Sequence, residues 1–134
     1  MKLALIDTDI LSQFLRGNPT VFQKFDTYIN QFGQINISII TYYEILNGLL
    51  YKDAKKQRNS FLEFIELNNV IPLSVSSAKI ASEIYAKLRK TGKEIGHTDT
   101  LIAGIAIANN MQLITNNTSH FSRIKNLKID NWMK

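Results

Sequence analysis

The sequence contains no cysteine, and this absence removes three classes of protein chemistry. Without a thiol there is no disulfide framework, no cysteine nucleophile and no cysteine-bound zinc site. At 134 residues the chain is long enough to bury a hydrophobic core without such supports. The phosphate-binding patterns G-x-x-x-x-G-K-[ST] and G-x-G-x-x-G are also missing, so neither of these nucleotide-binding loops is supported.

Proline, glycine and long apolar runs are scarce as well. Two prolines and six glycines leave no linker between segments, so we expect a single domain spanning residues 1–134. No stretch approaches the roughly 18 apolar residues that a membrane-spanning helix needs, and MKLALIDTD at the N-terminus is too polar for a signal-peptide core. We therefore expect a cytoplasmic protein that does not interact with membranes.

The sequence has fewer acidic than basic residues: 11 Asp and Glu compared with 16 Lys and Arg, which gives a net charge of +5. An excess of positive charge on so small a domain favours a polyanionic partner such as nucleic acid. The basic residues gather in 52–58, 87–93 and 123–128, and any one of these segments could equally be a solvated helix face or tail. Candidates for a surface that follows RNA phosphates are Arg16, Lys87, Arg89, Lys90 and Lys93.

Short β-prone runs alternate with longer segments of helical periodicity. The predicted strands are residues 3–7, 35–38, 70–73 and 112–115, with a last one near 127–129. The predicted helices are 8–16 (closed by residues 17–19), 19–32, 39–52, 53–68, 74–92 and 98–110, and residues 116–121 are expected to form a turn. This order predicts an α/β domain with a mainly parallel sheet and helices on both faces.

Four polar residues follow the predicted strands. Asp7 ends the first strand, Glu44 lies in an early turn of the helix after the second, Asp99 opens helix 98–110, and Asn117 follows strand 112–115. In parallel sheets these positions share one edge, where ligands bind. Converging carboxylates repel one another unless a cation lies between them, and oxygen ligands favour Mg²⁺ or Mn²⁺. The pattern indicates metal-assisted phosphodiester hydrolysis.

Each acid also has a purely structural interpretation. Asp7 or Thr8 could cap the helix that follows, because both residue types are common helix caps. Thr98 could cap helix 98–110, and Asp99 would then be an acid in the first turn, favoured by the helix dipole.

The remaining polar residues are equally open to two interpretations. The helix that carries Glu44 has its apolar stripe on the opposite side, so Glu44 faces either solvent or a cleft. An acid in the first turn of a helix, such as Asp9, is typically there because the helix dipole favours it. A loop histidine such as His97 is typically a surface residue, and Asn117 is typical of a tight turn after a strand.

Three segments, LIDTDILSQFLRG, ISIITYYEILNG and HTDTLIAGIAIANNMQLITNNTSHF, together resemble the PIN-domain ribonucleases, and particularly the VapC toxins of bacterial toxin–antitoxin pairs. The resemblance covers essentially the whole chain. It implies a three-layer PIN fold with a Mg²⁺- or Mn²⁺-dependent endoribonuclease site. By motif position, Asp7, Glu44 and Asp99 match the metal-binding acids of the family. Asn117 matches a catalytic position where many members carry a fourth Asp, and His120 stands where many carry another acid, which leaves open whether one or two metals bind.

The resemblance further implies a homodimer, a small VapB-like antitoxin that occupies the cleft, and a structured RNA substrate such as tRNA. A rival interpretation is a PIN-fold module for RNA binding or regulation that has lost its chemistry. The uncharged Asn117 is the feature that keeps this rival open.

Overall fold

The computed structural model describes all residues from 1 to 134 and contains one five-stranded parallel sheet. Its strands are β1 (Ala4–Ile6), β2 (Asn36–Ser38), β3 (Asn69–Ile71), β4 (Gln112–Ile114) and β5 (Ile129–Asp130). They lie in the order β3-β2-β1-β4-β5, and every neighbouring pair is parallel. The chain therefore starts at the centre of the sheet, builds outward to β3, and then crosses back to β4. Ligand sites of parallel sheets lie at this kind of switch point, beyond the carboxyl ends of the strands.

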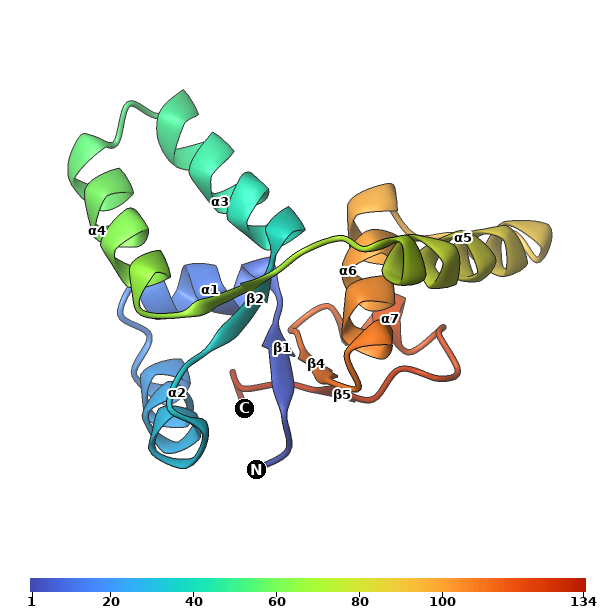
Figure 1. Ribbon diagram of the computed structural model, residues 1–134, viewed down its shortest axis with the longest axis horizontal. Coiled ribbons are helices and arrows are strands. Elements are labelled where there is room, and N and C mark those ends of the chain that lie inside the picture. The colour runs from blue at the N-terminus through green and yellow to red at the C-terminus, as the bar shows by residue number, and fades with distance from the viewer.

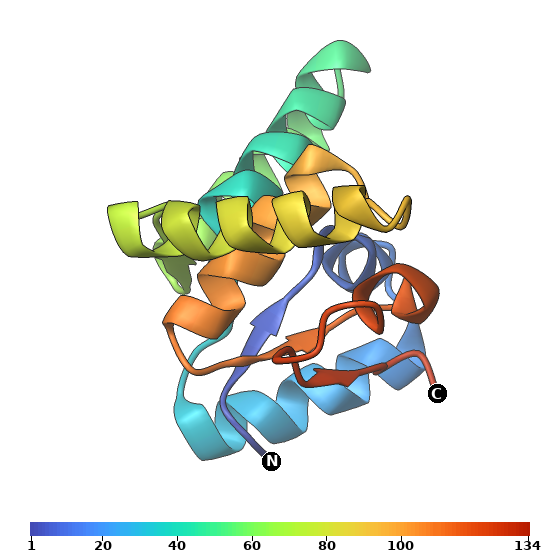
Figure 2. The ribbon, with the colours of Figure 1, turned by 90° about the vertical axis from the view of Figure 1, so that its right-hand side faces the viewer.

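Helices cover both faces of the sheet, as the sequence predicts. The helices are α1 (Thr8–Leu15), α2 (Pro19–Phe32), α3 (Ile39–Tyr51), α4 (Lys55–Glu66), α5 (Val75–Lys90), α6 (His97–Ala108) and α7 (Thr118–Phe121). Helices α1 to α4 lie on one side of β1, and α5 to α7 lie on the other (Figure 1). The α3–α4 hairpin projects away from the strands, and α5 crosses over α6 (Figure 2). The predicted three-layer α/β architecture is confirmed.

The two faces of the sheet have separate hydrophobic cores. Side chains of successive strand residues point to opposite faces. Accordingly Ala4 and Ile6 of β1 join the cluster under α1, α2 and α4, which includes the fully buried Phe25 and Trp132. Leu5 joins the cluster under α5 and α6. Because β1 is buried on both faces, its sequence is continuously apolar until Asp7.

Helices α5 and α6 approach each other closely at Gly104. A Cβ atom at this position would lie 2.6 Å from the backbone oxygen of Ser77 and 2.9 Å from the Cβ of Ala81. No larger residue fits there without moving α5 away from α6. Since α6 begins two residues before Asp99, this contact also fixes the position of that acid.

Most predicted boundaries differ from the structure by one or two residues, and three of the differences have a clear cause. Strand β3 ends at Ile71 because Pro72 has no N–H for the sheet. Helix α6 begins at His97 after an extended Gly96, so Thr98 is inside the helix and is not its cap. Residues 116–121 are not only a turn, because residues 118–121 form the short helix α7.

None of the helices combines the length and the apolarity that crossing a membrane requires.

Candidate functional site

Asp7 lies at the end of β1 with only 5% of its surface exposed. Its Oδ1 accepts a hydrogen bond from the backbone N–H of Thr8 at 2.8 Å, so Asp7 is the cap of α1. Its Oδ2 accepts from the Thr115 hydroxyl at 2.8 Å, across from β1 to the end of β4. The capping interpretation is thus correct, and the same carboxylate also faces the carboxyl edge of the sheet.

The surroundings of Asp7 oppose its negative charge. Burial, followed by the nearby charge of Asp9, raises the pKa of Asp7 from 3.8 to about 7. The hydrogen bonds from Thr115 and Thr8 act in the opposite direction, and the charge of Asp99 raises the pKa further. A carboxyl group in this state is stabilised by any cation that approaches it.

Asp9 is not only a first-turn acid that interacts with the dipole of α1, because its carboxylate also accepts two backbone hydrogen bonds. Its Oδ1 accepts from the backbone N–H of Ile10 at 2.7 Å, and its Oδ2 accepts from the backbone N–H of Asn116 at 3.0 Å. Burial raises the pKa of Asp9, and the two backbone hydrogen bonds oppose this rise. Asp9 therefore ties the start of α1 to the loop after β4 and adds negative charge beside Asp7.

Glu44 faces α1 rather than bulk solvent. Its Oε1 accepts from the Thr8 hydroxyl at 2.7 Å, and the Thr8 oxygen lies 3.0 Å from the hydroxyl of Thr41. Because a carboxylate only accepts, the Thr8 proton points to Glu44, and Thr41 is left to donate to Thr8. The cleft interpretation of Glu44 is therefore the correct one.

The sequence predicts an apolar stripe on α3 that consists of Ile39, Tyr42, Tyr43, Leu46, Leu49 and Leu50. Only part of this stripe is buried. Tyr43 is 63% exposed and Leu50 48% exposed, whereas Thr41 and Ile45 are buried against the rest of the domain. Helix α3 buries the side that meets α1, and Glu44 lies at the edge of this contact.

Asn117, His120 and Asp99 lie side by side. The Asn117 side-chain amide, Nδ2, lies 2.9 Å from Nδ1 of His120, and the same nitrogen lies 3.7 Å from Oδ2 of Asp99. As placed, the amide donates to Nδ1, so the neutral ring carries its proton on Nε2. The shorter contact is the hydrogen bond, and the longer one becomes an ion pair only when His120 is protonated.

The predicted residues are joined by one polar path along the carboxyl edge of the sheet. Asp7 bonds to the Thr115 hydroxyl, which accepts at 3.0 Å from the backbone N–H of Asn117, and Asn117 leads through His120 to Asp99. At the other end of the path, the residue after Asp7 binds Glu44.

Two hydroxyl groups of this path were not predicted. Thr8 was considered only as a cap, and Thr115 only as the end of a strand. The signal that could have found Thr115 is its position, because it directly follows β4 beside the central strand.

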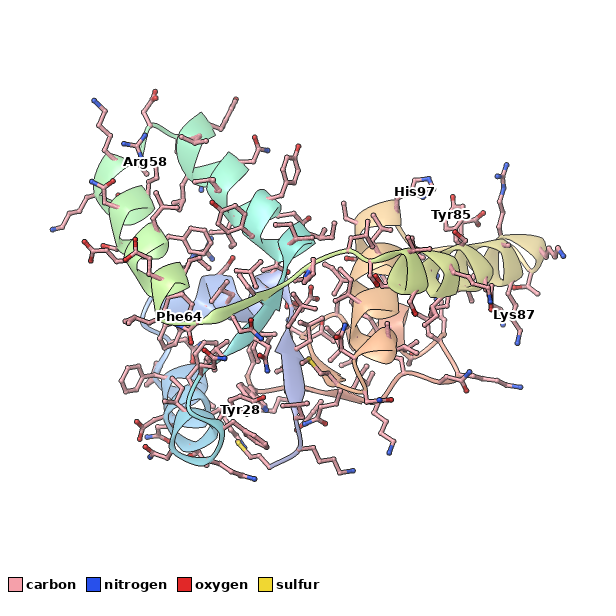
Figure 3. All side chains as sticks on the ribbon, viewed as in Figure 1. Tyr28, Arg58, Phe64, Tyr85, Lys87 and His97 are labelled. Carbon is pink, nitrogen blue, oxygen red and sulfur yellow. The ribbon has the colours of Figure 1, made fainter.

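His97 does not belong to this path. It is exposed at the start of α6, where its ring contacts that of Tyr85 on α5 in a tilted arrangement, with centroids 4.4 Å apart. Figure 3 shows both rings together at the α5–α6 junction. The surface interpretation of His97 agrees with this placement.

The donor set suits a hard cation, although its members are not closely gathered. No three acidic or histidine side chains lie near enough to one another to enclose a single ion. All the acids nevertheless offer oxygen ligands, which Mg²⁺ and Mn²⁺ prefer. The raised pKa of Asp7 marks a place where negative charge lacks a counter-charge. In their chemistry, these residues therefore fit the Mg²⁺ or Mn²⁺ ion that the sequence predicts.

Comparisons with known proteins agree with this fold. Residues 4–127 match the PIN domain family. The chain is 32% identical over 131 residues to ribonuclease VapC2 of Rickettsia felis, covering 97% of this chain and 98% of that protein. It is 28% identical to the tRNA(fMet)-specific endonuclease VapC of Shigella flexneri, with 96% of each chain covered. The crystal structure of VapBC2 from Rickettsia felis bound to a promoter DNA fragment superposes with a TM-score of 0.88 at 30% identity, covering 97% of this chain and 98% of that one.

Proposed function

Because this chain belongs to the PIN-domain family, we propose that it is a VapC-like, Mg²⁺- or Mn²⁺-dependent endoribonuclease that hydrolyses phosphodiester bonds in structured RNA. The observation that carries the proposal is the polar path joining Asp7 to Asn117, His120 and Asp99, with Glu44 bound to the neighbouring Thr8. It brings the acids to the edge of the sheet where a phosphate can reach them.

In this proposal Asp7, Glu44 and Asp99 hold the metal ion. When bound, Mg²⁺ or Mn²⁺ supplies positive charge for the phosphoryl oxygens and lowers the pKa of water. The chain supplies orientation, since Thr115 fixes the Asp7 carboxylate and Thr8 fixes that of Glu44. Asn117 adds no charge, and its catalytic contribution is to orient His120.

The relatives give the proposal its substrate class and its partners. One is named a tRNA(fMet)-specific endonuclease, so tRNA is the first RNA to test. Several related structures are VapBC complexes, and we expect a small VapB-like antitoxin to inhibit this protein in the cytoplasm. We also expect a homodimer, whose interface would cover exposed apolar side chains such as Tyr43, Leu73 and Val75.

The direct test is incubation of the purified protein, free of antitoxin, with total tRNA in Mg²⁺, in Mn²⁺ and in EDTA. We expect discrete fragments with either metal and none in EDTA. The matched control is Asp99→Asn, which removes one charge with little change in side-chain shape and should leave the RNA intact.

Two outcomes would contradict the proposal. Fragments that persist in EDTA or with Asp99→Asn would come from a contaminating nuclease or from a site elsewhere. Intact RNA in every lane, together with calorimetry that detects no binding of Mg²⁺ or Mn²⁺ to folded protein, would favour a module that has lost its chemistry.

A further inference from the structure

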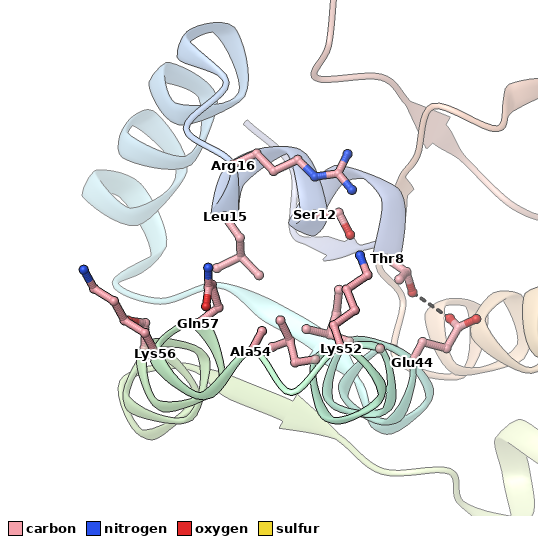
Figure 4. Close-up of a pocket in the computed structure, with 13 residues that line it drawn as sticks. Thr8, Ser12, Leu15, Arg16, Glu44, Lys52, Ala54, Lys56 and Gln57 are labelled. Carbon is pink, nitrogen blue, oxygen red and sulfur yellow. Dashed lines mark hydrogen bonds between the residues drawn. The ribbon is translucent and has the colours of Figure 1, made fainter.

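A groove leads away from the acids between α1 and the α3–α4 hairpin. It has a volume of about 620 Å³, and Thr8 and Glu44 stand at its inner end. One wall is formed by Ser12 of α1 and by Arg16, which directly follows α1. The other is formed by Gly48 of α3 and by Lys52, which directly follows α3, and Lys56 of α4 lies at the outer end (Figure 4). We call this the α1–α3 groove.

Positive charge dominates the α1–α3 groove. Arg16, Lys52 and Lys56 line it, and the one acid among its lining residues is Glu44. None of the three cations takes part in an ion pair, since the only pairs in the structure are Lys79–Glu83 and Asp99–His120. Arg16 and Lys52 extend over the groove from opposite walls (Figure 4). Unpaired cations on facing walls attract a linear anion.

The rest of the lining combines hydrophobic and polar side chains. Four of the 13 lining residues are hydrophobic, namely Leu15, Ile45, Leu49 and Ala54. Ser12, Gln57 and Ser60 offer hydroxyl and amide groups, which suit ribose and phosphate oxygens. A side chain at Gly48 would meet no atom within 4 Å, so the wall at this position is unfilled.

We propose that the α1–α3 groove holds the backbone phosphates of the RNA on one side of the cleaved bond, with Arg16, Lys52 and Lys56 as the phosphate-binding residues. This inference rests on the proposed nuclease function and adds the route by which the RNA reaches Glu44. It selects Arg16 from the candidates that the sequence suggested and replaces the others with Lys52 and Lys56. The basic residues Lys87, Arg89 and Lys90 lie instead in the last turn of α5.

The test compares two triple variants that remove the same charges. The groove variant is Arg16→Gln, Lys52→Gln and Lys56→Gln, and the control is Lys87→Gln, Arg89→Gln and Lys90→Gln. Binding of a fluorescein-labelled RNA hairpin is measured by anisotropy in EDTA, where no cleavage occurs, at several salt concentrations. Thermal unfolding of both variants is measured first, and single substitutions replace any triple variant that fails to fold.

We expect the groove variant to raise the Kd for the hairpin at least about 10-fold and to reduce the slope of log Kd against log salt by about 2. The control should change the Kd by less than a third of this effect. In the cleavage assay the groove variant should raise KM more than it lowers kcat.

Two results would overturn the assignment. Equal losses in both variants would mean that affinity follows net charge alone. An unchanged Kd in the groove variant, together with lost inhibition by the antitoxin encoded beside the gene, would assign the groove to the protein partner. Failure of the nuclease proposal would look different, because wild-type protein would then bind the hairpin through the groove without cleaving it in Mg²⁺ or Mn²⁺.

Discussion

The acidic residues of the site form two halves that differ in how many hydrogen bonds hold their carboxylates in place. The strand half consists of Asp7 and Asp9 at the start of α1, and all four of their carboxylate oxygens accept a hydrogen bond. The helix half consists of Glu44 on α3 and Asp99 on α6. Glu44 has one oxygen bound, by Thr8, and Asp99 has only the 3.7 Å contact with His120.

This difference means that folding fixes the orientation of only some of the carboxylates in the site. The strand half is held by backbone N–H groups and a buried hydroxyl, which cannot move without disturbing α1 or β4. The helix half is held by single side chains that rotate at little cost. The strand half should therefore govern the stability of the protein, and the helix half should govern how the site closes around its ligands.

The largest expected effect is the loss of activity when Asp7 is changed to Asn. Cleavage should fall by more than the roughly 100-fold that losing an outer partner of a metal ligand costs. The free energy of unfolding of the metal-free protein at pH 8 should hold or rise, because a buried charge is removed. Fragment yield on gels and thermal unfolding at pH 8 measure the two effects.

Asp99→Asn serves as the comparison, since it should abolish cleavage with almost no change in stability. If Asp7→Asn instead lowers the melting temperature strongly, the hydrogen bonds that Asp7 accepts from Thr8 and Thr115 outweigh the cost of its buried charge.

The next effect is the pH dependence of stability, which the strand half should dominate. The pKa of Asp7 in the folded protein is about 7, above its ordinary value of 3.8. The folded chain therefore binds this proton more tightly than the unfolded chain does. Its contribution is complete below about pH 4 and is lost as the pH rises through about 7, at most about 4 kcal/mol in total. Urea unfolding of the metal-free protein from pH 4 to 8 measures this loss, and in Asp7→Asn it should largely disappear.

A smaller effect is expected for Thr115→Val, which keeps the shape of the side chain and removes the hydroxyl that donates to Asp7. The loss should cost about 1–3 kcal/mol of unfolding free energy, because a hydrogen bond to a charged group is broken. It should be larger at pH 8 than at pH 5, where Asp7 is mostly protonated. A cost that is equal at both pH values would mean that the hydroxyl does not act on the Asp7 charge.

The smallest effect on stability is expected for Thr8→Val, which removes the donor to Glu44 in the helix half. Stability should change by less than 1 kcal/mol, or about half the Thr115→Val cost, because Thr8 is only partly buried. Cleavage should fall about 10-fold, since Glu44 loses its orientation. Parallel unfolding and cleavage measurements on the two Thr variants test the contrast directly, and similar stability losses would contradict it.

The sequence predicted the features that depend on short patterns. The apolar run before Asp7, the helical spacing around Glu44 and the strand before Asn117 are local, and each placed its residue at the correct edge. The sequence could not predict the contacts of Asp9 with Asn116 or of Asp7 with Thr115, because these join residues 107 and 108 positions apart. The buried side of α3 was predicted only in part, because α3 also buries Thr41 and Ile45, which lie outside its apolar stripe.

The central position of β1 has a consequence for when the protein becomes active during its synthesis. Translation produces β1 first, yet β1 pairs with β4, and the Thr115 hydroxyl that holds Asp7 comes from the last fifth of the chain. A nascent chain shorter than 99 residues contains the first acid of the site but neither Asp99 nor Thr115. The site is therefore complete only after β4 and Thr115 have been synthesised, long after its first acid.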